Sequence, residues 1–258
     1  MTRHPAGPGP SPSTSPSVDI TDDPEPPAGR WRRAAAAALP VVMPVVMRQV
    51  FRSTVRRFGP RRGYQAGFAL YWATCWAAAA AVAGPGRLAR AFHRPQRPLP
   101  TPRALACAAL AVPAVGAVAT EFLPHARRAG LPAIATALWV GATNALAEEV
   151  FWRALPVAVF PDNPVRGWLW PAAGFTAWHL VPLTAGGAGS RRTAALLGGA
   201  ALIGVGYGWV AFGTRSVIPV IGPHAVIDAS GVRAAMTIWL GQATWTTRRS
   251  VQQLRARE

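Results

Sequence analysis

Six apolar segments of about membrane-spanning length constrain this chain more than any other feature of its sequence. A helix that crosses the hydrocarbon core of a bilayer needs about 20 mainly apolar residues. In chain order, the segments that approach this length are 64–84, 104–122, 133–158, 167–183, 193–212 and 216–240. The sequence therefore predicts an all-α fold, a multi-pass transmembrane helical bundle of about six spans in the cell membrane.

The composition supports a membrane protein with anionic surroundings. Hydrophobic residues make up 51% of the chain and charged residues only 14%, whereas about 25% charged residues is usual in a soluble domain. The net charge is +17, and all 27 basic residues are arginine. Such a surplus suits anionic lipid or nucleic acid. Because the arginines lie between apolar runs and no nucleic-acid-binding signature accompanies them, we predict an anionic membrane lipid as a partner and no nucleic acid.

The first 62 residues are expected to lie outside the spans. Residues 1–30 are rich in Pro, Ser, Gly and Asp, which predicts a disordered arm. In residues 31–62, a short apolar run is followed by apolar residues that alternate with arginines. This pattern predicts an N-terminal amphipathic helix on the membrane surface. A transmembrane domain is expected over 63–246, followed by a basic tail over 247–258.

The distribution of arginine predicts an orientation. If six spans alternate, one side of the membrane receives fourteen of the arginines outside the spans and the other receives seven. Cytoplasmic loops carry the excess of positive charge, so both termini are expected in the cytoplasm. The five arginines of the 87–103 loop, on the opposite side, count against this assignment.

Three charged residues interrupt the third predicted span. Glu148, Glu149 and Arg153 stand between apolar runs on both sides, and a charge at bilayer depth costs about 2.5–3.5 kcal/mol on insertion scales. Glu149 and Arg153 are four residues apart and can pair on one helical face, whereas Glu148 points about 100° away. One anchored and one free carboxylate suits catalysis. A buried ion pair that only fixes helix packing is the alternative.

Two further predicted spans contribute polar groups of their own. His179 lies on the helix after the double glutamate, and His224 and Asp228 are four residues apart on a later one. Gathering these groups around one wetted cavity removes the cost of leaving each alone in lipid. Two carboxylate-bearing helices with two histidines can hold zinc, or a glutamate can activate water while a histidine supports an oxyanion. Both alternatives predict hydrolysis.

The three motifs together resemble a known pattern. Glu148-Glu149-x-x-x-Arg153, Phe175-x-x-x-His179 and His224-x-x-x-Asp228 are similar to the motifs of the CPBP family. That family comprises CAAX prenyl endopeptidases and bacteriocin-processing or immunity membrane proteins. The resemblance covers about 133–240, which we take as the motif core of the transmembrane domain.

The resemblance implies an intramembrane peptidase that acts on a peptide or protein substrate. It implies that Glu148 and His179 position and activate water, while His224 and Asp228 stabilise the tetrahedral intermediate or help to bind metal. Glu149 with Arg153 would give structural support. The candidate catalytic residues are thus Glu148, Glu149, Arg153, His179, His224 and Asp228, and the candidate zinc ligands are Glu148, His179, His224 and Asp228. Whether zinc is required stays open.

Asp228 departs from the family pattern, which often has Asn there. An Asn side chain can donate a hydrogen bond to an oxyanion, whereas an ionised Asp cannot. Either Asp228 is protonated, or it orients His224, or it binds metal.

Two other classes of function are alternatives. A non-catalytic immunity or scaffold protein of the same fold would not need both histidines, so the intact motifs favour the peptidase. A transporter or channel could use the polar cluster as an ion relay. Transporters commonly carry internal repeats, and the two halves of this sequence show none.

Overall fold

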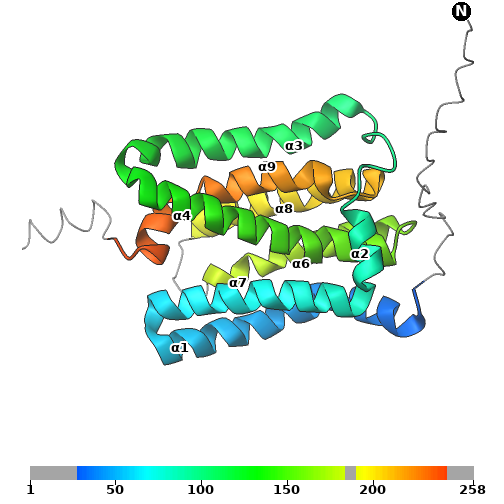
Figure 1. Cartoon of the computed structure of the whole chain (residues 1–258), viewed down its shortest axis with the longest axis horizontal. Coiled ribbons are helices and arrows are strands. Elements are labelled where there is room, and N and C mark those ends of the chain that lie inside the picture. Colours follow the sequence, from blue (N-terminus) through cyan, green and yellow to red (C-terminus); the bar gives the residue numbers. More distant parts are fainter. Residues whose placement is uncertain (1–27, 184–189, 243–258) are drawn as a thin grey trace, which may run out of the picture.

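The computed structural model describes residues 28–183 and 190–242, and every regular element in that part of the chain is a helix (Figure 1). The prediction of an all-α membrane protein is confirmed. The α-helices are α1 Arg30–Ala83, α2 Pro85–Ala91, α3 Arg103–Ala117, α4 Leu123–Glu149, α5 Leu155–Val159, α6 Trp170–Trp178, α7 Leu180–Leu183, α8 Ser190–Thr214, α9 Ile218–Ala229 and α10 Val232–Ala234. Four π-helical turns join them: η1 Val118–Phe122, η2 Val150–Ala154, η3 Val165–Leu169 and η4 Ala235–Trp239.

Helix α1 is a hairpin of two antiparallel limbs. It breaks at Gly59, whose φ of 78° is readily adopted by glycine alone, and Pro60 then starts the second limb. The limbs approach closely, since a Cβ on Gly67 would lie 2.9 Å from the ring of Phe51. Met43, Met47 and Phe51 of the first limb are buried in the bundle.

The basic segment expected on the membrane surface belongs to this hairpin. Residues 48–58 continue the first limb, and 60–62 open the second. The apolar side chain of Phe51 packs inward, while Arg48, Arg52 and Arg56 are exposed. Apolar and basic residues thus lie on different faces of this helix, and buried apolar side chains of the limb pack on protein. Its placement on the membrane surface stays a prediction.

A second long hairpin carries the double glutamate. Residues 103–129 run as α3, η1 and the start of α4, and Gly130, with φ 72°, turns the chain. Residues 131–159 then return through the rest of α4, η2 and α5. Glu148, Glu149 and Arg153 therefore lie inside one continuous rod.

Three helical runs are long and apolar enough to cross a membrane: Arg30–Ala83, Arg103–Val159 and Thr193–Thr214. The first two fold back at Gly59 and Gly130, so each supplies two rods. The predicted spans 64–84, 104–122, 133–158 and 193–212 fall on these runs. The remaining two, 167–183 and 216–240, form shorter helices and π-helical turns.

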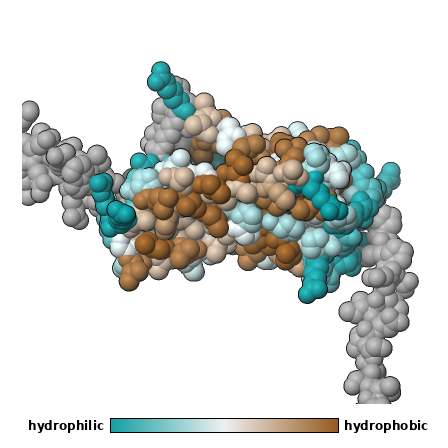
Figure 2. Space-filling view, turned by 90° about the horizontal axis from the view of Figure 1, so that it is seen from above, coloured by the Kyte–Doolittle hydropathy of each residue, from teal (hydrophilic) through white to brown (hydrophobic). Residues whose placement is uncertain are grey.

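The described chain begins and ends at opposite ends of the bundle (Figure 1). The first limb of α1 begins with Arg30, Arg32 and Arg33, and Arg32 donates to the backbone carbonyl of Ala83, beside the start of α2. The limb thus adds arginines to the less basic side of the predicted count. The arm and the basic tail lie mostly outside the described residues. Figure 2 shows hydrophilic side chains at both ends of the bundle and hydrophobic surface between them.

Candidate active site

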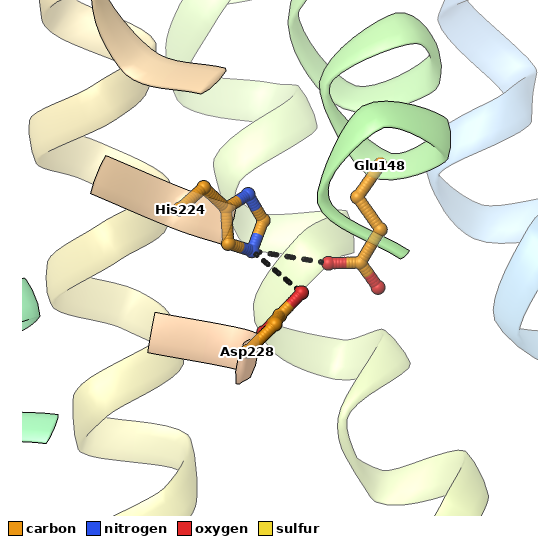
Figure 3. Close-up of side chains that lie close together, drawn as sticks. All are labelled: Glu148, His224 and Asp228. Carbon is orange, nitrogen blue, oxygen red and sulfur yellow. Dashed lines mark ion pairs between the residues drawn. The ribbon is translucent and has the colours of Figure 1, made fainter. Parts of the chain in front are cut away.

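The site lies where the end of α4 faces α9. Gly141 permits this contact, because a Cβ there would stand 2.4 Å from the backbone nitrogen of Ala229. From this contact, Glu148 lies about two turns further along α4, Asp228 is the residue next to Ala229, and His224 lies just over one turn before Ala229 on α9. Ligand atoms of Glu148, His224 and Asp228 lie within 4.8 Å of one another (Figure 3).

His224 is the centre of the site, and it is almost fully buried. Its Nδ1 lies 2.6 Å from Oε1 of Glu149. A carboxylate only accepts hydrogen bonds, so this contact assigns a proton to Nδ1. The Nε2 atom then faces Oε2 of Glu148 at 3.5 Å and Oδ2 of Asp228 at 3.7 Å. Two carboxylates thus converge on one imidazole nitrogen.

Glu149 forms the predicted pair with Arg153 and also orients His224. Its Oε1 lies 3.1 Å from Nη1 of Arg153, and the guanidinium stands over the ring of Phe175 at 4.2 Å. Oε2 of Glu149 and both Nη atoms of Arg153 are buried without a hydrogen-bond partner among the described residues. Glu149 therefore does more than the structural support that the family resemblance implied.

Glu148 is not a free carboxylate, contrary to the expectation from helix geometry. Its Oε1 accepts hydrogen bonds from the hydroxyl of Tyr71 at 3.1 Å and from Nε1 of Trp178 at 3.0 Å. Those two rings stack with centroids 3.7 Å apart. Sequence reasoning missed both aromatic residues. Buried Tyr and Trp usually find a polar partner, but nothing in the sequence indicates which one.

Asp228 accepts a hydrogen bond from Nδ2 of Asn144 at 2.8 Å. The Oδ1 atom of Asn144 in turn accepts from Nε1 of Trp72 at 2.8 Å. Asn144 stands four residues before Glu148, hence on the same face of α4, and this spacing was a signal that sequence reasoning overlooked. The Asp228 side chain is 22% exposed, against 3% for His224, so the site is most open beside Asp228.

His179 lies at the edge of the site. Its Nδ1 donates to the backbone carbonyl of Phe175 at 2.8 Å. The ring of Phe175 contacts both imidazoles, with centroids 4.7 Å from His179 and 6.0 Å from His224. His179 is not a member of the close group of metal-ligating atoms. The structure thus brings together Glu148, Glu149, Arg153, His224 and Asp228. His179 contacts this group through the ring of Phe175.

The donor atoms fit a divalent cation. One imidazole nitrogen with two carboxylate oxygens is a ligand set that zinc takes, with a fourth position left for water. Ligands about 2 Å from a tetrahedral ion stand about 3.3 Å apart. Nε2 of His224 lies 3.5 and 3.7 Å from the two carboxylate oxygens, and all three donor atoms lie within 4.8 Å of one another, so a modest approach of the carboxylates would complete the set. The carboxylate of Glu149 on the other nitrogen of His224 is the usual support for a metal-binding histidine.

Comparison with known proteins covers the core of this site. Residues 130–230 match the family model described as type II CAAX prenyl endopeptidase, Rce1-like. The matched range holds all six predicted site residues and leaves α1 outside. No curated protein and no solved structure matches the chain.

Proposed function

Because residues 130–230 form an Rce1-like segment of the CAAX endopeptidase type, consistent with the CPBP family, we propose that the chain is an intramembrane endopeptidase. It hydrolyses a peptide bond with a water molecule activated at Glu148. One observation carries this proposal: the oxygen atoms of Glu148 and Asp228 converge on Nε2 of His224 inside an apolar helical bundle.

Glu148 serves as the general base. Tyr71 and Trp178 occupy its Oε1, so Oε2 is the oxygen that can take a proton from water. The protonated carboxyl can then donate that proton to the leaving amine. His179, whose Nδ1 is held by a backbone carbonyl, has Nε2 available to help position the water.

His224 stabilises the developing negative charge. Glu149 holds its Nδ1–H and stabilises the imidazolium, whose Nε2–H can donate to an oxyanion. Asp228 orients the same ring from the more open side of the site. Its Oδ2 accepts from Asn144 and faces Nε2 of His224, which is compatible with an orienting or metal-binding role for Asp228.

Zinc is compatible with this arrangement. Glu148, His224 and Asp228 would hold the ion, which when bound supplies a Lewis acid that polarises a carbonyl. The zinc-assisted and glutamate-only forms of the proposal differ in their response to a chelator. No observation favours the non-catalytic alternative.

Cleavage of a peptide library by the purified full chain tests the proposal. The substitution Glu148→Gln keeps an oxygen for Tyr71 and Trp178 but removes the base, so turnover should fall by about 100-fold or more. The melting temperature should stay that of the wild type. A matched control is Glu121→Gln, which changes an exposed carboxylate in η1 and should cleave normally.

Two outcomes decide the assignment. Normal cleavage per folded molecule of Glu148→Gln would show that Glu148 is not the base. Loss of wild-type cleavage in chelator, restored by added zinc, would select the zinc-assisted form, and full activity in chelator would select the glutamate-only form.

A further inference from the structure

Two successive residues of α1 contact the site, although α1 lies outside the matched segment. Tyr71 donates to Glu148, and Trp72 donates to Asn144, which in turn donates to Asp228. We propose that Tyr71 and Trp72 are positioning residues that aim Glu148 and, through Asn144, Asp228 at Nε2 of His224. This inference rests on the proposed function only where peptide cleavage is measured. Adjacent helical residues point about 100° apart, which lets one turn of α1 touch both sides of the site.

Tyr71 fixes the orientation of the Glu148 carboxylate toward His224. The tyrosine hydroxyl accepts a hydrogen bond from Nε1 of Trp152 at 2.8 Å, so its own proton is directed to Oε1 of Glu148 at 3.1 Å. Trp178 donates to the same oxygen. Since both donors occupy Oε1, the carboxylate cannot rotate freely, and Oε2 stays turned to His224.

Trp72 fixes the orientation of an amide rather than a carboxylate. An indole N–H is a donor only, whereas the Asn144 side chain has a donor and an acceptor end. Trp72 donates to Oδ1 of Asn144, and this directs Nδ2 to Asp228. Without Trp72, the amide could turn and place its oxygen against the Asp228 carboxylate, which would push Asp228 away from His224.

The position of this part of α1 is itself constrained. Gly67 packs against the ring of Phe51, and the Gln65 side chain donates to the backbone carbonyls of Ile238 and Trp239 at 2.8 and 3.2 Å. These contacts tie α1 to its own first limb and to η4. These contacts fix the position of the turn of α1 that carries Tyr71 and Trp72.

The test compares Tyr71→Phe with the matched control Tyr207→Phe. Both tyrosines are fully buried. Tyr71→Phe loses two hydroxyl hydrogen bonds, one to Glu148 and one from Trp152, whereas Tyr207→Phe loses one. The Tyr207 hydroxyl, however, donates to the carbonyl of Leu110 at 3.1 Å, while its ring stands 6.0 Å from that of His224. Tyr71→Phe is expected to lose more thermal stability than Tyr207→Phe, because it also leaves the indole N–H of Trp152 without its acceptor. Zinc affinity and kcat are therefore compared per folded molecule, and an effect on them limited to Tyr71→Phe separates positioning from packing.

Two measurements are made on the detergent-solubilised full chain: zinc affinity by calorimetry, and kcat and KM for a cleaved peptide. Loss of an outer-shell partner typically costs 10–100-fold in metal affinity or activity. We expect a drop of that size in zinc affinity and in kcat for Tyr71→Phe and Trp72→Phe, with KM unchanged. Tyr207→Phe should stay within about threefold of wild type. If Tyr71→Phe does not fold, Asn144→Leu, which keeps the shape of the side chain, tests the Asp228 branch.

The outcomes separate the two proposals. A wild type that cleaves while Tyr71→Phe and Trp72→Phe keep its kcat and zinc affinity would overturn positioning and leave the peptidase intact. A wild type that binds zinc without cleaving, with weaker binding in the two variants, would overturn the peptidase and support positioning. If the wild type cleaves without binding zinc, the kcat values of Tyr71→Phe and Trp72→Phe alone decide whether positioning holds. A chain that neither binds zinc nor cleaves would overturn both.

Discussion

Glu149 carries much of the charge balance of the site, because one of its oxygens contacts both Arg153 and His224. Arg153 is the only arginine among the buried residues of the described chain. Its guanidinium is held by Glu149 and by the face of Phe175. This ion pair holds the carboxylate that contacts His224.

Arg153→Ala should therefore lower stability and activity together. Removing one partner of a buried ion pair typically costs about 3–5 kcal/mol, because the other charge remains buried. Solubilised yield and melting temperature should both fall. Arg166→Ala is the control, since Arg166 also stands over a phenylalanine ring, that of Phe160 at 5.8 Å, but is exposed. Equal melting temperatures for the two variants would contradict a structural role for the pair.

At the scale of the elements, the contact between α4 and α9 decides whether the site exists. These helices carry Glu148 and Glu149 on one side and His224 and Asp228 on the other. Gly141 allows the backbones to meet at Ala229, in the way that small residues allow close helix packing in membranes.

Gly141→Ala should separate the two helices. The added Cβ would fall 2.4 Å from a backbone atom that cannot move aside, and overpacking of this kind costs about 1–3 kcal/mol. Because a misplacement of about 1 Å can cost about 100-fold in rate, peptide cleavage should fall more sharply than stability. The matched control is Gly222→Ala on α9, where a Cβ meets open space. There the better helix propensity of Ala should leave stability unchanged or raise it by up to about 1 kcal/mol. Normal cleavage by Gly141→Ala would show that the helices tolerate the added methyl group.

At the scale of the whole molecule, the first limb of α1 sets the topology. The turns at Gly59 and Gly130 lie at one end of the bundle, and α2 with the turn after α5 lies at the other (Figure 1). Both ends are hydrophilic (Figure 2). Arginines lie beside the turns at Gly59 and Gly130 and in α2, and their contact with anionic lipid stays a prediction. If the first limb of α1 crosses the membrane, Arg30 and the Gly59 turn lie on opposite sides of it.

Labelling of single cysteines with a membrane-impermeant maleimide measures this topology. In a chain with Cys75 and Cys107 replaced by alanine, Arg62→Cys and Arg127→Cys should label from one side of the membrane. Asn163→Cys and Trp31→Cys should label from the other. All four positions are exposed. If Trp31→Cys labels together with Arg62→Cys, the first limb does not cross, and the surface helix expected from the sequence is correct.

The sequence by itself determined the helices and the local geometry of the motifs. Runs of about 20 apolar residues can hardly be anything but helices in a membrane, and spacings of four residues place Glu149 with Arg153 and His224 with Asp228. These relations depend only on residues within one or two turns, so a periodic pattern is enough to predict them.

Tertiary structure decided the rest. The bonds from Glu149 to His224 and from Tyr71 to Glu148 join residues 75 and 77 positions apart, and no local pattern encodes such partners. The first limb of α1 shows the same limit, because Met43, Met47 and Phe51 form an apolar stripe that suits a lipid surface or a protein core equally well. Lipid tails are as apolar as a packed leucine, so hydropathy cannot distinguish the two surroundings, and only the packing of the limb against the bundle does so.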